Sequence, residues 1–195
     1  MRRKPVKTST RNLVMCALCA AVICVLSPLS LPIGPVPISL ASFAVMLSAA
    51  LLGAKWGTIA TAIYILLGAV GVPVFAGWSA GIGCIAGQTG GYIIGYLPLA
   101  FLTGLFTDKL VRRTAGKAKY AFLMIGMILG TVALYLIGTA WFVAISGAAL
   151  ADAMGWCVLP FIPGDIVKMI IVAIVAPKVS EALQHAGVRV GGEAA

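Results

Sequence analysis

Charged residues are scarce in this sequence, and their scarcity excludes a water-soluble fold. Only 10% of the 195 residues are charged and just 5 are Asp or Glu, whereas 62% are hydrophobic and the mean hydropathy is +1.10. Soluble domains are about 25% charged. A chain with so few charges cannot cover its surface with polar groups, so the sequence predicts an integral membrane protein.

The residues that enzymes and metal sites require are also missing. The single histidine, His185, stands alone near the C-terminus, and no Ser/His/Asp set or zinc-binding helix can be assembled around it. The stretch around Lys117 lacks the first glycine and the hydroxyl residue of a phosphate-binding loop. Cys16 and Cys19 have the spacing of a zinc or redox site, but no second pair completes one, which favours buried thiols. We therefore expect no enzymatic activity, no cofactor and no metal.

Long apolar runs make up most of the chain and predict its fold. A bilayer core about 30 Å thick requires roughly 20 apolar residues per helical crossing. Six apolar runs are separated by charged or Pro/Gly-rich stretches, at residues 13–27, 38–52, 58–72, 85–106, 120–146 and 160–179. The first run follows basic residues as a signal peptide does, but no clear cleavage site follows it, so we expect a retained helix. The prediction is an all-α integral membrane protein, a six-transmembrane-helix bundle (residues 12–183) between a basic tail (1–11) and a C-terminal tail (184–195).

The positive charges alternate along the chain and predict its orientation. Lys and Arg occur in the N-terminal tail, at Lys55, within residues 109–119 and near the C-terminus, whereas residues 27–37, 73–83 and 147–159 have none. Positively charged loops stay on the cytoplasmic side. Both termini are therefore predicted to be cytoplasmic, in a plasma-membrane protein. The formal charge of +9 does not indicate a nucleic-acid partner, because the basic residues stand between apolar runs rather than on one folded face.

The uncharged connections between the runs are rich in proline and glycine. Examples are residues 31–37 (LPIGPVP) and 71–78 (GVPVFAGW). Non-helical backbone at membrane depth is tolerated only against protein or a wet cavity. We expect these connections to fold back as a cap over a ligand chamber that opens to the outside.

Two ionisable residues near the start of the last run are candidates for ligand contact. Asp165 and Lys168 are three residues apart in a predicted helix and so share one face. Each costs about 2.5–3.5 kcal/mol at the centre of a spanning helix on insertion scales, which disfavours an idle pair at that depth. The alternative is an ion pair at the membrane interface, with Asp165 favouring the positive end of its helix.

Small and polar residues mark two further segments. Residues 83–96 (GCIAGQTGGYIIGY) combine glycines with candidate ligand contacts, namely Gln88, Thr89 and Tyr92. Glycines four apart in the same stretch have the spacing of membrane helix packing. Ala17 and Ala21 form a similar small-residue face on the first helix, where internal packing is the default and docking of another membrane subunit is the alternative.

Three motifs in one order resemble the BioY family: residues 71–78 (GVPVFAGW), 87–96 (GQTGGYIIGY) and 163–168 (PGDIVK). The likeness runs from about Arg11 to Leu183, and it departs from the family pattern at Gln88, where the family has proline. Members of that family are the biotin-specific substrate-binding (S) components of energy-coupling-factor (ECF) transporters. The resemblance implies a six-helix bundle that binds biotin from outside and works with a transmembrane coupling protein and two ATPase subunits.

The resemblance also implies roles for single residues. Ala17 and Ala21 match the face that docks the coupling protein, and the charged pair of the last run meets the ligand. Biotin offers ureido N–H donors, a carbonyl, an apolar thioether ring and a carboxylate, so an apolar pocket with few polar groups suits it. Which polar group meets which end of biotin stays open. The residues expected in the pocket are Phe75, Trp78, Gln88, Thr89, Tyr92, Asp165 and Lys168.

Other functions fit the sequence less well. A self-sufficient carrier driven by an ion gradient would need an acidic relay across the bundle, and only Asp165 is available. An S component for another vitamin would share the architecture. A membrane enzyme acting on lipid would need clustered reactive residues, whereas Asp108 and Asp152 stand on opposite sides with nothing beside them. A purely structural scaffold would leave the Asp165 and Lys168 pair without a role.

Overall fold

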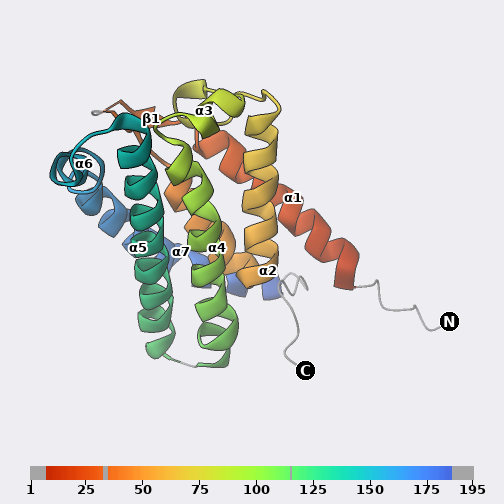
Figure 1. The fold of residues 1–195 in the computed structure, drawn as a ribbon. Helices are drawn as coiled ribbons and strands as arrows, with labels where there is room; N and C mark the ends of the chain where they lie inside the picture. Colours follow the sequence, from red (N-terminus) through yellow and green to blue (C-terminus); the bar gives the residue numbers. More distant parts are fainter. Residues whose placement is uncertain (1–7, 33–34, 115, 186–195) are drawn as a thin grey trace.

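The computed structural model describes residues 8–32, 35–114 and 116–185, and most of them are helical (Figure 1). The predicted tails, residues 1–11 and 184–195, lie mostly outside the described residues. The elements in chain order are α1 (Thr8–Leu26), β1 (Ser30–Leu31), β2 (Ile38–Ser39), α2 (Ala41–Ala69), the 3-10 helix η1 (Ala76–Trp78), α3 (Ile82–Ala86), α4 (Gly90–Lys109), the 3-10 helix η2 (Val111–Arg113), α5 (Ala118–Ser146), α6 (Leu150–Cys157) and α7 (Phe161–His185).

Several of these helices are suited to a membrane by length and composition. Within the described residues, α2, the stretch Gly90–Arg113 and α5 are each long and apolar enough to cross a bilayer. Helices α6 and α7, which are bent by 44° relative to each other, would add a fourth crossing if they form one span. The apolar part of α1, Thr10–Leu26, is shorter than these spans. The prediction of an all-α membrane protein is confirmed at this level.

Helix α2 contains the second and third predicted runs, joined at a break in its middle. Gly53 has φ +81° and ψ −176°, a conformation outside the helical region that only glycine adopts readily. A Cβ atom at Gly53 would collide with the carboxylate of Asp108. That carboxylate accepts a hydrogen bond from the backbone N–H of Ala54 at 2.8 Å, and so caps the second half of α2. Arg112 holds the junction by donating to the Leu51 carbonyl at 3.1 Å and pairing with Asp108 at 3.0 Å.

The chain reverses its direction at this break. Ser42, in the first half of α2, bonds to Asp165 near the β1–β2 end of the molecule. Gly53 lies beside Asp108, at the far end of α4. The second half then returns, because the Gly68 carbonyl accepts a hydrogen bond from the Gly81 N–H in the η1–α3 connection. Each half is shorter than the roughly 20 residues of an ordinary crossing.

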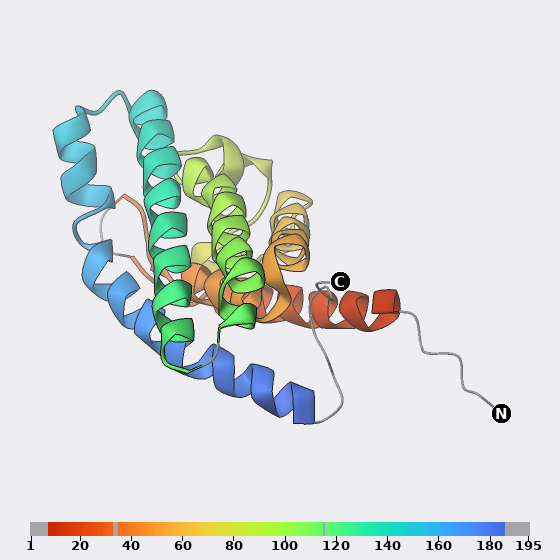
Figure 2. The ribbon, with the colours of Figure 1, turned by 90° about the horizontal axis from the view of Figure 1, so that it is seen from below.

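Helix α4 lies at the centre of the bundle, between α2 and α5. Glycines make the close approach of α4 and α5 possible: a Cβ on Gly91 would strike Trp141, and one on Gly95 would strike Leu134. Helix α7 lies obliquely across one side of the bundle, against α2 and α5 (Figure 2). Helix α1 packs chiefly on α2 and forms the edge of the molecule (Figure 1).

The connections segregate by charge to opposite ends of the bundle. The β1–β2 hairpin, the η1–α3 segment and α6, which carry no Lys or Arg, gather at one end (Figure 1). The basic connection between α4 and α5 lies at the other end (Figure 1). This arrangement agrees with the alternation of charge along the sequence.

The α2 junction generates a stability prediction. Gly53→Ala should lower the free energy of unfolding by about 1–3 kcal/mol, because alanine is strained at this backbone conformation and collides with Asp108. The measurement is thermal unfolding of the purified protein in detergent. The matched control is Gly83→Ala in α3, where a Cβ would meet nothing within 4 Å. Equal melting temperatures for the two variants would contradict the assigned role of Gly53.

Candidate ligand-binding site

The charged pair on α7 is buried inside the protein. The Lys168 ammonium lies 3.0 Å from Asp165 Oδ1, as the spacing of three residues predicts. Asp165 is 3% exposed and Lys168 is 8% exposed. A buried ion pair must recover a large desolvation cost through further hydrogen bonds. The remaining hydrogen bonds of the pair therefore determine how far this desolvation cost is recovered.

Residues at the start of α2 supply two of those bonds. Lys168 Nζ donates to the backbone carbonyl of Ser39 at 2.8 Å and to the hydroxyl of Ser42 at 3.0 Å. The Ser42 hydroxyl in turn donates to Asp165 Oδ1 at 3.2 Å. With Asp165 as its third acceptor, Lys168 uses all three of its ammonium hydrogens.

Tyr135 of α5 completes the cluster from the other side. Its hydroxyl donates to Asp165 Oδ2 at 2.6 Å, so each carboxylate oxygen has a partner. Hydrogen bonds to a charged acceptor are the stronger kind. Three elements, α2, α5 and α7, therefore meet through one carboxylate.

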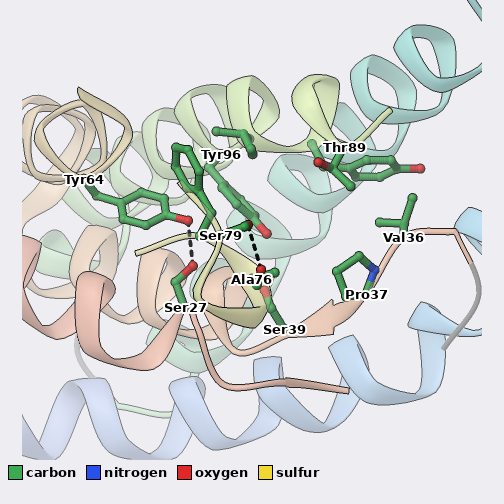
Figure 3. Close-up of a pocket in the computed structure, with 12 residues that line it drawn as sticks. Ser27, Val36, Pro37, Ser39, Tyr64, Ala76, Ser79, Thr89 and Tyr96 are labelled. Atoms are coloured by element: carbon green, nitrogen blue, oxygen red, sulfur yellow. Dashed lines mark hydrogen bonds between the residues drawn. The ribbon is translucent and has the colours of Figure 1, made fainter. Parts of the chain in front are cut away.

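A larger cavity lies beside this cluster, under the connections at the uncharged end (Figure 3). It encloses about 90 Å³. The Tyr64 hydroxyl and the Ser27 hydroxyl are hydrogen-bonded at 2.6 Å on its wall (Figure 3). Its lining residues come from the end of α1, the β1–β2 hairpin, α2, the η1 segment and α4, and they are Ser27, Val36, Pro37, Ser39, Tyr64, Phe75, Ala76, Ser79, Thr89, Tyr92, Ile93 and Tyr96.

Aromatic rings form much of the wall of this cavity. Tyr64 meets Phe75 edge to face, with ring centroids 5.6 Å apart, and lies 6.5 Å from Tyr96. Tyr92 stacks on Phe161 of α7 at 6.5 Å and shares a hydrogen bond of 3.0 Å with a threonine hydroxyl of α5. Such rings offer large apolar faces with polar tips, which suits a ring-shaped ligand.

A smaller cavity of about 30 Å³ adjoins the charged cluster. Both cavities share Val36, Pro37, Ser39, Tyr92 and Tyr96, and the smaller one also reaches Tyr135, Asp165 and Lys168. Ligand pockets usually measure about 300–1,000 Å³. Both cavities are smaller than this range.

The structure brings most of the predicted residues together. Phe75, Thr89 and Tyr92 line the larger cavity, whereas Asp165 and Lys168 line the smaller one. Two predicted contacts lie outside both cavities: Gln88 is exposed, and Trp78 is 63% exposed with a φ of +63°. The cysteines of α1 at positions 16 and 19 are buried free thiols.

Five residues that line the cavities were not predicted from the sequence, namely Ser39, Ser42, Tyr64, Tyr96 and Tyr135. A signal for Tyr135 exists, because hydroxyl residues recur every fourth position in α5, at Thr131, Tyr135 and Thr139, and so share one face. The serines at the start of α2 follow a Pro-rich stretch and have no comparable pattern. Their partnership with Lys168 spans more than 120 residues of sequence and becomes visible only in the folded chain.

The helical bundle and its site define the chain as a multi-pass membrane protein of the solute-transport class. It belongs to the BioY family, whose model matches residues 1–185.

Two relatives and one crystal structure agree with this assignment. The chain is 37% identical over 171 residues to a protein named biotin transporter BioY from Rhizobium etli, covering 85% of this chain and 91% of that one. It is 39% identical over 168 residues to a probable biotin transporter BioY from Pyrococcus horikoshii, covering 86% and 95%. The fold matches a crystal structure described as the S-component for biotin from an ECF-type ABC transporter, with a TM-score of 0.83, 31% identity and coverage of 92% and 95%.

The buried pair generates a prediction about stability. Lys168→Met should lower the free energy of unfolding by about 3–5 kcal/mol, because it leaves Asp165 buried without its cation. Combining it with Asp165→Asn should recover most of that loss, since no unpaired charge remains. Thermal unfolding in detergent measures both variants.

The control for this prediction is Asp152→Asn, which changes an exposed acid at the same end of the bundle and should leave the melting temperature unchanged. Equal stability of the single and double variants would show that the pair is not buried as described.

Proposed function

We propose that this chain is the biotin-capture S component of an ECF-type uptake transporter. The observation that carries the proposal is the buried pair of Asp165 and Lys168 beside an aromatic-walled cavity, in a chain of the BioY family. The names of its relatives and of its structural neighbour support the same ligand. The chain itself binds the vitamin and does not act as an enzyme.

The ureido group of biotin is the part that suits the charged pair. It presents one carbonyl acceptor and two N–H donors, which complement an ammonium and a carboxylate held 3.0 Å apart. Lys168 already donates to three acceptors, so the ligand carbonyl replaces one of them. The Ser42 hydroxyl is the one to replace, because it both accepts from Lys168 and donates to Asp165, as a ureido group would. The ring then packs against Tyr92 and Tyr96.

We infer that the uncharged end of the bundle faces the outside. Charge alternation supports six crossings with both termini in the cytoplasm, counting the two halves of α2 separately. Biotin then enters from outside, through the connections that cover the larger cavity. The protein would lie in the plasma membrane, where uptake from the medium takes place.

The exposed face of α1 suits docking of the coupling protein. Ala17 and Ala21 are exposed one turn apart, and Leu18 beside them is 57% exposed. Small residues let a second helix approach closely in a membrane. We propose that a transmembrane coupling protein packs here and links the chain to a pair of ATPase subunits.

The first prediction from this proposal concerns ligand contact. Asp165→Asn or Lys168→Ala should weaken biotin binding by about ten- to a hundredfold, since a hydrogen bond to a charged group contributes about 1.5–3 kcal/mol and 1.4 kcal/mol is a factor of ten. The double neutral variant should not recover binding, because the ligand is the missing partner. Equilibrium binding of labelled biotin in detergent measures the effect, with Asp152→Asn as the unaffected control. Unchanged affinity in a folded double variant would remove the pair from the site.

The second prediction concerns docking. Ala17→Leu should leave biotin affinity unchanged, because this side chain points away from the cavities, and should abolish coupled uptake by pushing the partner helix away. Uptake in cells that contain the coupling protein and ATPases, together with binding to the purified chain, separates the two effects. Ala20→Leu, which enlarges the buried face of the same helix, is the contrasting variant and should destabilise the chain itself. Loss of biotin binding in Ala17→Leu would assign Ala17 to internal packing.

A further inference from the structure

The break in α2 lies against the last turns of α4, at the end of the bundle away from the ligand cavities. A Cβ atom on Gly104 would strike the backbone of Ala54, just after the break. Arg112, just beyond α4, donates to the Leu51 carbonyl at 3.1 Å, just before the break. The α4–α5 connection continues from this point (Figure 1). Residues from the middle of α2, the end of α4 and the α4–α5 connection therefore meet at one place.

Four exposed cations belong to this junction. They come from α2, the end of α4, the end of η2 and the residue that precedes α5, and they are Lys55, Lys109, Arg113 and Lys117. The carboxylate at the junction, Asp108, already pairs with Arg112 at 3.0 Å. Among the residues that the structure describes, none of the four cations pairs with a carboxylate. We call these four residues the basic cluster, and its positive charge is not neutralised within the described chain.

Neighbouring aromatic residues indicate the depth of the basic cluster in a membrane. Trp56 is half-buried, and Lys55 Nζ lies 5.7 Å from the centre of its ring. At the start of α5, Lys119 Nζ lies 5.3 Å from the ring centre of Tyr120. Trp and Tyr are enriched at the membrane–water interface, and long basic side chains near helix ends extend to the same level. The phosphates of phospholipid headgroups lie at this level.

We propose that the basic cluster binds the headgroups of anionic phospholipids. Clusters of Lys and Arg next to a spanning helix attract anionic lipids. A lipid suits the cluster better than an acidic protein does, because Lys55 stands on a membrane helix beside an interfacial tryptophan, where the neighbouring molecules are lipids. Arg112 is not part of the site, since it holds the α2 junction. The inference does not depend on biotin, because both cavities lie at the other end of the bundle.

Quenching of tryptophan fluorescence by brominated lipids tests the proposal on the full chain. The chain has four tryptophans, so one variant keeps only Trp56 and a control keeps only Trp156 at the uncharged end, with phenylalanine at the other three positions. Each is placed in phosphatidylcholine bilayers that contain the same fraction of brominated phosphatidylglycerol or of brominated phosphatidylcholine. Near Trp56 the anionic lipid should bind more tightly by about threefold or more, and near Trp156 the two lipids should bind equally. Salt at about 1 M should abolish the preference, because it screens exposed charges.

Replacing the cluster tests which residues hold the lipid. Lys55→Gln, Lys109→Gln, Arg113→Gln and Lys117→Gln together should abolish the preference near Trp56, and Lys55→Gln alone should reduce it. The melting temperature should stay unchanged, since these side chains pair with no carboxylate of the described chain. The matched control is Lys178→Gln, an exposed cation of α7 outside the cluster, which should leave the preference intact.

Native mass spectrometry of the unmodified chain makes the same comparison without tryptophan substitutions. In detergent with equal amounts of the two lipids, bound phosphatidylglycerol should predominate, and the fourfold variant should show no such excess. Equal binding of the two lipids would overturn the proposal and favour an acidic protein partner for the cluster. An unchanged preference in the fourfold variant would overturn the assignment to these residues. Loss of the preference on adding inorganic phosphate at constant ionic strength would indicate a site for free phosphate and overturn the lipid as its occupant.

Discussion

The structure depends on one buried carboxylate. Asp165 receives hydrogen bonds from Lys168 of its own helix, Ser42 of α2 and Tyr135 of α5. An isolated charge buried among apolar helices would be unfavourable, so the carboxylate depends on partners from all three helices. The same bonds fix α7 against the bundle at one end, while an exposed ion pair between Lys119 and Glu181, at 2.9 Å, links α5 and α7 at the other. The hydrogen bonds that hold the charged pair are thus the same bonds that pack α7 against the bundle.

The arrangement explains why a binding site and a rigid scaffold coexist in so short a chain. Helix α4 supplies the centre, where glycines allow close packing, and the Asp108 cap allows α2 to turn back without a long loop. Because the connections at the basic end are short, more residues are left for the connections at the uncharged end. There the hairpin, the η1–α3 segment and α6 surround the cavities. Among the described residues at that end, Lys168 is the one cation, and Asp165 pairs with it at 3.0 Å.

Much of the fold followed from composition and charge, because a bilayer imposes strong rules on both. The apolar runs predicted α1, α4, α5 and α7 closely, and the three-residue spacing predicted the Asp165 and Lys168 pair. The break at Gly53 was placed only as a gap between two runs, since its cause is a contact with Asp108, 55 residues further along the chain. Gln88 was predicted in the pocket from local composition and Trp78 from the family resemblance. The structure places both outside the cavities, because tertiary packing determines which side chains line a cavity.

On this view the isolated chain holds a specific site for biotin. Its most direct test is equilibrium binding of labelled biotin to the purified chain in detergent, without any other subunit, with riboflavin and thiamine as competitors. We expect saturable binding at one site per chain, which excess biotin displaces and neither competitor affects. Binding that any of the three vitamins displaces equally, or no saturable binding by a folded chain, would contradict it.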